Sequence, residues 1–373
     1  MKAENEQSSQ STISNSDQDK KKEVYIEVLR VVAIIFVIFN HTSSNGFFLF
    51  ASLKPTQIRF WVDMFFTVFC KFAVPMFFAL SGALMLGQES IEFKKQIRRM
   101  LRTIAVLIIV SLIYYLVEKS IYNYPLTVDD FFRRLYSYRL KYHLWFLYDY
   151  IAFLITMPFI NKMAKGLTNS LFYYLCILAV AFQAIIPIVE YLVFRNAFSM
   201  YSHLRPSWII ELIVLYPMVG YYLKNERKPV AMMKLLIGWL INLALILFTC
   251  WLTYQKSLDV GELSEASSQG FLSIFVIFNV IVIYETVKIF VENRRMNKYV
   301  RKMVISAGAC TFGIYLFHPL ILDSQFKLSY FEWCRSIGFE GLIPSFVFVL
   351  FVFVICWTGV LILKLIPGIR RLL

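Results

Sequence analysis

Two ionisable residues near the start of the chain have types and a spacing that suit chemistry. Arg30 and His41 are eleven residues apart in a largely apolar stretch. In an α-helix, eleven residues correspond to a rise of about 16 Å. The rotation about the helix axis is about 20° more than a whole number of turns, so both side chains lie on one face of the helix. An imidazole can act as a general base, and a guanidinium can stabilise negative charge. Because ionisable groups are costly in apolar segments, this pair is the first candidate for function.

Each of these residues also has a structural interpretation, which stays open. Arg30 can extend to lipid headgroups, and His41 can cap the end of a helix. The other histidines are His143, His203 and His318, and none of the four has a local ligand spacing such as His-x3-His. The six cysteines show no CxxC spacing either. We therefore predict no metal site and no disulfide framework.

The composition identifies the environment of these residues. Of the 373 residues, 59% are hydrophobic and 17% are charged, which excludes an ordinary water-soluble enzyme. Apolar stretches of about 20 residues recur, the length that crosses a bilayer as a helix. We expect about ten spans, approximately at residues 24–48, 60–86, 104–116, 144–160, 171–194, 207–223, 235–254, 271–290, 303–322 and 342–363.

The basic residues predict the orientation. Most lysines and arginines outside the spans fall on the side of the N-terminus, which should be cytoplasmic. The sequence thus predicts an all-α, polytopic helix bundle in the cell membrane, with about ten transmembrane helices and both termini cytoplasmic. Anionic lipid headgroups account for the net charge of +14, and we predict no nucleic-acid partner. Residues 1–22 are polar and are expected to form a disordered cytoplasmic tail.

One loop carries a helix signal of its own. Between residues 119 and 143, Thr127 is followed by Asp129 and Asp130 and then by Phe131, Phe132 and Leu135. This order is typical of an N-cap, an acidic first turn and an apolar stripe, so we predict a short interfacial helix.

Four sequence blocks together resemble one family. Arg30 to His41 is similar to the Arg-x10-His signature of the membrane acyltransferase-3 family, whose members are polytopic O-acyltransferases of bacterial surface polysaccharides. Residues 74–82 (VPMFFALSG) resemble its Pro-x-Phe-Phe-x-x-Ser-Gly block, and residues 143–147 (HLWFL) and 313–319 (GIYLFHP) resemble later landmarks. The blocks occur in the family's order, so the resemblance implies one acyltransferase-3-like transmembrane domain over residues 23–373.

The resemblance implies a donor and residues that bind it. Acyl transfer would use acetyl-CoA, or another acyl-CoA, as a co-substrate from the cytoplasm. The basic cluster Arg98, Arg99 and Arg102 lies where the family has a similar one, and guanidinium groups suit phosphates; positive-inside charge alone also explains it. Ser81, beside Gly82, is expected in tight helix packing or in contact with the coenzyme A arm.

The resemblance also implies roles for the first pair. His41 would be the general base toward the acceptor, or a nucleophile that carries the acyl group. Arg30 would position the thioester arm or stabilise negative charge. The candidates for an orienting acid or for the acceptor site are Asp63, Asp149, Glu211, Trp145 and His318. Pairing within the bundle, or for His318 a place in an interfacial aromatic belt, is the structural alternative for these residues.

The function implied is transfer of an acyl group, most simply acetyl, to a hydroxyl of an extracytoplasmic or lipid-linked cell-envelope glycan. Transfer would be direct or through a separate acyl-accepting partner protein, with membrane lipids as the surrounding partners. The alternative is a polytopic transporter or exporter of polysaccharide or small molecules. That class usually shows internal repeats and broken helices at matching positions, which the sequence does not display.

Overall fold

The computed structural model describes residues 24–122, 127–226, 230–261, 272–294 and 296–373. Within these ranges the regular structure is entirely helical, and no strand occurs. The all-α prediction is therefore confirmed for the described part of the chain. The predicted tail, residues 1–22, lies outside the described residues.

The chain divides into two compact units. Unit 1 takes its described residues from within 24–77, 227–315 and 328–357, and unit 2 from within 78–226, 316–327 and 358–373. The segments of each unit lie far apart in the sequence, so long-range helix packing builds both. Each unit is described by itself below.

Unit 1 contains the first helix, residues 24–40, and the turns that follow it. Its other elements are η1 (Ser43–Asn45), η2 (Leu49–Ser52), α2 (Ile58–Phe69), η3 (Cys70–Phe72), α11 (Met232–Val260) and α13 (Val276–Asn293), with most of α14 (Lys298–Leu322), α15 (Gln325–Ser336) and α16 (Leu342–Leu363). Helix α11 packs against both α2 and α13. Phe36 of the first helix meets the rings of Phe69, Phe72 and Phe346 edge to face, so aromatic packing fixes this helix in the unit.

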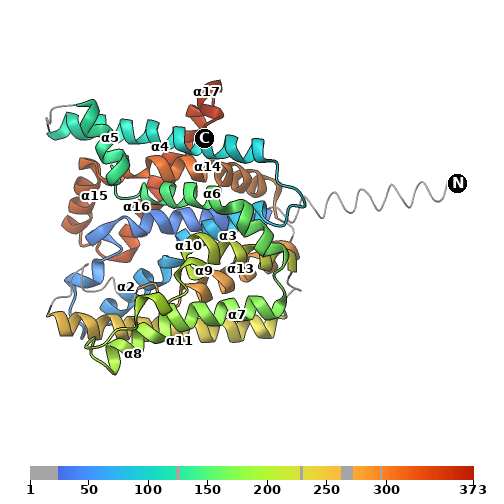
Figure 1. Ribbon diagram of the computed structural model, residues 1–373. Coiled ribbons are helices and arrows are strands. Elements are labelled where there is room, and N and C mark those ends of the chain that lie inside the picture. Colours follow the sequence, from blue (N-terminus) through green and yellow to red (C-terminus); the bar gives the residue numbers. More distant parts are fainter. Residues whose placement is uncertain (1–23, 123–126, 227–229, 262–271, 295) are drawn as a thin grey trace. The chain divides into compact units, whose positions relative to one another are not determined.

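Unit 2 is built mainly on α6, which contacts α4 and α10 (Figure 1). Its elements are most of α3 (Ala73–Met85), α4 (Phe93–Tyr122), α5 (Val128–Ser137), α6 (Trp145–Lys165), α7 (Asn169–Val180), the π-helix η4 (Ala181–Ile185), α8 (Ile186–Leu192), η5 (Ser202–Leu204), α9 (Ser207–Ile210), α10 (Leu212–Tyr221), the π-helix η6 (Tyr222–Glu226) and α17 (Pro367–Arg370).

Two glycines bring α3 and α10 into direct backbone contact in unit 2. A Cβ atom on Gly82 would lie 2.0 Å from the carbonyl oxygen of Pro217, and one on Gly220 would lie 1.7 Å from that of Ala79. Only a residue without a side chain allows such an approach. Gly82, the neighbour of Ser81, therefore packs tightly against α10.

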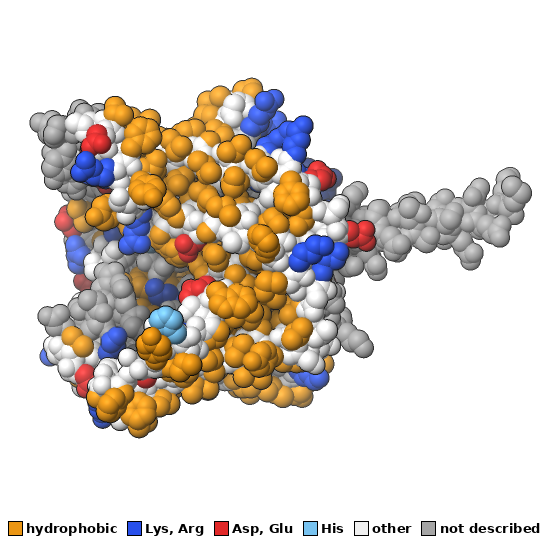
Figure 2. Space-filling model, viewed as in Figure 1, with side chains coloured by type: hydrophobic (Ala, Val, Ile, Leu, Met, Phe, Trp, Pro, Cys, Tyr) orange, Lys and Arg blue, Asp and Glu red, His pale blue; other side chains and the backbone are white. Residues whose placement is uncertain are grey.

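Six helical segments of the described residues are long and apolar enough to cross a membrane: Ile58–Met85, Phe93–Glu118, Asn169–Leu192, Met232–Val260, Lys298–Leu322 and Leu342–Leu363. Each contains or overlaps a predicted span, and the last coincides with one. Large apolar side chains remain exposed on these helices, and hydrophobic side chains are spread widely over the face in Figure 2. Such a surface suits lipid rather than water. The protein is therefore a membrane protein.

Of the other four predicted spans, two are shortened or interrupted, and two correspond to helices outside these six segments. The predicted span 24–48 holds a helix only over 24–40, and the predicted span 207–223 is broken at Glu211, whose backbone is extended (ψ 157°) between α9 and α10. Segments 144–160 and 271–290 correspond to α6 and α13. The third predicted span, 104–116, lies inside a helix of 30 residues, α4.

The predicted interfacial segment is a helix, α5, with the expected cap. The Thr127 hydroxyl accepts a hydrogen bond from the backbone N–H of Asp130 at 3.2 Å. The Asp130 carboxylate in turn accepts bonds from the Tyr115 hydroxyl of α4 at 2.8 Å and from Arg134. These hydrogen bonds, that of Tyr115 first, lower the pKa of Asp130. The cap and this contact hold α5 against α4.

Candidate active site

Arg30 forms an ion pair within the first helix. Its Nη1 donates to Oε1 of Glu27 at 2.6 Å, and the side chains are 29% and 19% exposed, respectively. Glu27 is one turn nearer the start of the helix, and residues three apart share a face. Glu27 was not among the predicted site residues. The signal available for it was an acid three residues before an arginine inside a predicted span.

Glu27 is itself confined by a neighbouring helix of unit 1. A Cβ atom on Gly308 of α14 would lie 2.0 Å from Oε2 of Glu27 and 2.9 Å from its Cβ. The side chain of Glu27 therefore lies directly over this glycine, in space that any larger residue would fill. This contact joins residues far apart in the sequence, so no local pattern predicts it.

His41 follows the last residue of the same helix. Its backbone N–H donates to Ile38 O at 3.1 Å, and its side chain is half-buried. Arg30 thus lies on the first helix, whereas His41 is the residue directly after its end, so the helix stops one residue short of the predicted pair. The two residues are separated along the helix axis by about 16 Å.

Three hydroxyl side chains hold the turn that follows His41. The buried Thr42 hydroxyl donates to Phe39 O at 2.7 Å and accepts from the backbone N–H of Phe47 at 2.9 Å. Thr67 of α2 donates to Phe47 O, and Ser345 of α16 donates to Asn45 O. Backbone groups that would otherwise be unpaired are thereby satisfied, and the position of His41 is fixed from several elements.

The predicted acid in unit 1 has a partner of its own. Asp63 of α2 is buried, and its Oδ2 lies 3.7 Å from Nε of Arg59, one turn earlier. This is the structural alternative stated for Asp63, a pairing within the bundle.

The predicted basic cluster lies on the first turns of α4, in unit 2. Arg98 is exposed and Arg99 is half-buried. Arg102 donates from Nε and Nη2 to Leu372 O at 3.3 and 3.0 Å. It therefore anchors the C-terminal segment of the unit. Ser81 is half-buried on α3.

Other candidates in unit 2 gather near the start of α6. Trp145 is the first residue of this helix, and Asp149 lies one turn later, on the same face. Glu211 lies at the break between α9 and α10, close enough to Asp149 for a coulombic interaction between the two carboxyl groups. Their distance in the sequence did not indicate this interaction.

His318 lies in a buried aromatic cluster rather than in an exposed interfacial belt. It is fully buried, and its ring meets that of His143 edge to face at 5.5 Å between centroids. His143 is also fully buried and contacts the rings of Tyr114 and Tyr142. Burial and the nearby carboxylate of Asp323 raise the pKa of Tyr142. The two histidines are 175 positions apart, so only the fold reveals their contact.

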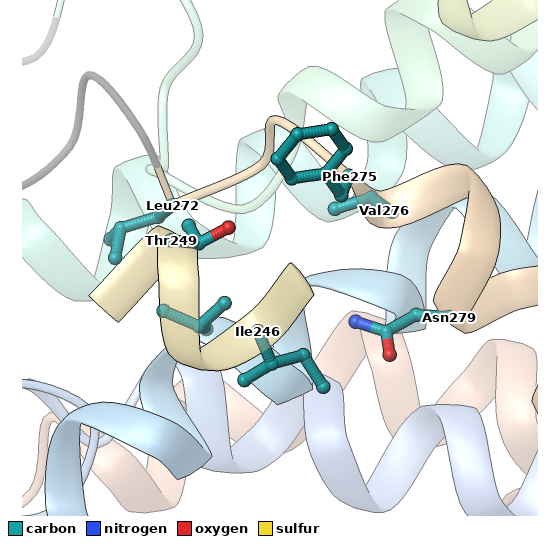
Figure 3. Close-up of a pocket in the computed structure, with 7 residues that line it drawn as sticks. Ile246, Thr249, Leu272, Phe275, Val276 and Asn279 are labelled. Carbon is teal, nitrogen blue, oxygen red and sulfur yellow. The ribbon is translucent and has the colours of Figure 1, made fainter. Parts of the chain in front are cut away.

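Neither the pocket in unit 1 nor any acidic, histidine or cysteine cluster of the described residues adds to this site. A small pocket in unit 1 (Figure 3) is lined by Val68, Ile246, Thr249, Leu272, Phe275, Val276 and Asn279. It contains none of the predicted site residues, and its polar groups are the Thr249 hydroxyl and the Asn279 amide, which accepts from Asn242 at 2.6 Å. Among the described residues, no group of three or more His, Cys, Asp or Glu side chains is arranged to hold a metal ion.

The protein is thus a membrane protein whose described part is all-helical, with Arg30 on the first helix and His41 directly after it. The family model of the acyltransferase domain, acyltransferase-3, matches residues 23–363. The chain therefore belongs to the acyltransferase-3 family and is a membrane acyltransferase. No curated protein and no solved structure matches it.

Proposed function

We propose that the protein is an integral membrane O-acetyltransferase of the cell membrane. It moves an acetyl group from cytoplasmic acetyl-CoA to a hydroxyl of a cell-envelope glycan or of its lipid-linked precursor. About ten helices cross the membrane, and both termini are cytoplasmic. The observation that carries the proposal is the family match over residues 23–363, together with Arg30 on the first helix of that region and His41 directly after the end of this helix.

In the proposed reaction, His41 is the general base. Its imidazole takes the proton of the acceptor hydroxyl while the hydroxyl oxygen attacks the carbonyl carbon of the thioester. The carbon–sulfur bond then breaks, and the thiolate of coenzyme A takes the proton from the imidazolium. The products are an acetyl ester and free coenzyme A. A half-buried imidazole held by a rigid turn supports this role, because a base must be both accessible and positioned.

Arg98 and Arg99 are proposed to bind the phosphates of the donor. Their position on the first turns of α4 and the exposure of Arg98 support this role, since guanidinium groups form bidentate contacts with phosphate. Asp149 and Glu211, with Trp145, are proposed for the acceptor side, where carboxylates and an aromatic ring suit sugar hydroxyls and sugar faces.

The test is the release of free coenzyme A from acetyl-CoA by the protein purified in detergent, with and without crude envelope glycan. We expect release that depends on the glycan in the wild type. We expect His41→Ala to lower the rate by roughly 10²-fold or more, because general base catalysis contributes at that level. A monodisperse elution profile shows that the variant is folded. Absence of release in the wild type, with movement of glycan into proteoliposomes, would support transport instead.

A further inference from the structure

The ion pair of Arg30 with Glu27 points the guanidinium away from His41. Glu27 precedes Arg30 by one turn, so the 2.6 Å contact draws the arginine toward the start of the helix. Along the helix axis, Arg30 is about 16 Å and Glu27 about 21 Å from His41. The guanidinium of Arg30 lies between these two heights on the axis. A group that stabilises an oxyanion must lie within hydrogen-bond distance of that oxygen. In this position Arg30 is far from any carbonyl that is attacked beside His41.

The guanidinium is held by Glu27, which is itself confined. The carboxylate of Glu27 binds Arg30, and the Glu27 side chain lies directly over Gly308 of α14, where a larger residue would displace it. A charged pair in an apolar environment is also costly to separate. Arg30 uses Nη1 for this bond, and its side chain is 29% exposed. The remaining N–H donors can therefore serve a ligand.

We infer that Arg30, positioned by Glu27, binds the phosphate end of the pantetheine arm of the donor and takes no part in stabilising the reacting carbonyl. The inference rests on the proposed function, in which the donor is an acyl-CoA. The extended arm separates the thioester from the phosphates by a distance comparable to that between His41 and the guanidinium. A donor whose thioester lies at His41 therefore brings its first phosphate to the level of Arg30. Glu27 is a positioning residue in this arrangement.

Two donors with the same thioester separate this role from a role at the carbonyl. Acetyl-CoA carries the phosphates, whereas S-acetyl-pantetheine lacks them. We expect Arg30→Ala to raise KM for acetyl-CoA by about tenfold or more, because a hydrogen bond to a charged group contributes at that level. We expect kcat to stay within about twofold, and KM for S-acetyl-pantetheine to change little. His41→Ala should lower kcat with both donors.

Variants of the neighbouring residues test the positioning role. Glu27→Ala should raise KM for acetyl-CoA in the same way as Arg30→Ala, and the double variant should be no worse than Arg30→Ala alone. Glu27→Gln keeps an acceptor oxygen and should recover part of the effect. Gly308→Ala should displace the Glu27 side chain and raise KM for acetyl-CoA. Gly359→Ala is the matched control, because the position on α16 is open and a Cβ there meets nothing within 4 Å.

A binding measurement separates this inference from the proposed function. The dissociation constants of coenzyme A and pantetheine are measured by calorimetry for the wild type and Arg30→Ala. If Arg30→Ala loses affinity for coenzyme A but not for pantetheine, the inference is supported. This holds even if the wild type transfers no acetyl group, a result that would contradict only the proposed function. Transfer by the wild type with equal coenzyme A affinity in Arg30→Ala overturns the inference, as does a fall of kcat with both donors. If the wild type neither binds coenzyme A nor transfers the acetyl group, both the inference and the proposed function fail.

Arg30→Lys, which keeps the charge, is the control for misfolding of the alanine variant. Its affinity for coenzyme A should lie between those of the wild type and Arg30→Ala.

Discussion

Thr42 is the residue on which the position of His41 most depends. Its hydroxyl joins the end of the first helix to the backbone of Phe47. Thr42→Val keeps the shape but leaves the Phe47 N–H without this acceptor in the interior. We expect a loss of about 1–3 kcal/mol in stability and a fall in kcat that exceeds any change in KM, because the imidazole shifts.

The matched control for this prediction is Thr156→Val. The Thr156 hydroxyl bonds only to carbonyl groups of the turn before it in α6, so its loss leaves no donor unpaired. Melting temperature in detergent and steady-state kinetics measure both effects. Equal effects of the two substitutions on kcat would show that the turn does not position His41.

Residues in one helix could be predicted, and contacts between helices could not. The eleven-residue spacing predicted one helix for Arg30 and His41, and the structure has a helix that contains Arg30 and ends at the residue before His41. The contact of Gly308 with Glu27, and that of His143 with His318, join distant segments. A single sequence contains no signal for them. The roles of the site residues stay predictions.

Among the elements, the crossing of α3 and α10 tolerates a larger residue least. A Cβ on Gly220 would lie 1.7 Å from Ala79 O, a backbone atom that cannot move without shifting its helix. Gly220→Ala should therefore destabilise unit 2 by about 1–3 kcal/mol or more. Gly238→Ala is the control, because the same change in α11 meets only Val282 Cγ2, at 3.4 Å.

Helix propensity favours alanine at both positions by up to about 1 kcal/mol, so only packing separates the two variants. The fraction of protein that stays monodisperse after heating in detergent measures the difference. A Gly220→Ala variant as heat-resistant as Gly238→Ala would mean that the two helices do not touch as described.

Elements whose limits are set by local chemistry were predicted closely. Residues 342–363 were predicted as a span and form one helix with the same limits, α16, because they are uniformly apolar. The cap at Thr127 correctly predicted α5. The length of α4 was underestimated because its first turns are basic, and hydropathy does not register a helix that continues outside the apolar region. The break at Glu211 was not predicted, because no proline or glycine stands at that position; beside it, the Gln183 side chain donates to the Ile210 carbonyl, a contact between distant segments.

At the scale of the whole molecule, the number of helices that cross the membrane determines which helix ends face the cytoplasm, where the proposed donor acetyl-CoA is found. Six helices qualify by length and composition, and the proposed ten add segments such as α6. Three exposed positions separate the alternatives: Ser90 before α4, Ser137 at the end of α5 and Lys165 at the end of α6. If both α4 and α6 cross the bilayer, Ser137 is extracytoplasmic and the other two are cytoplasmic.

Single cysteines at these positions, in a background without the six native cysteines, are treated in intact cells with a maleimide that does not cross membranes. We expect Ser137→Cys to react, and Ser90→Cys and Lys165→Cys to react only after the cells are permeabilised, which serves as the control for reactivity. Reaction of both Ser137→Cys and Lys165→Cys in intact cells would show that α6 does not cross. The basic cluster at the start of α4 would then still be cytoplasmic, but the break at Glu211 would have to be assigned again to one side of the membrane. The proposed placement of the acceptor near Asp149 depends on this result. Asp149 lies near the start of α6, and this end of the helix is on the outer side only if α6 spans the membrane.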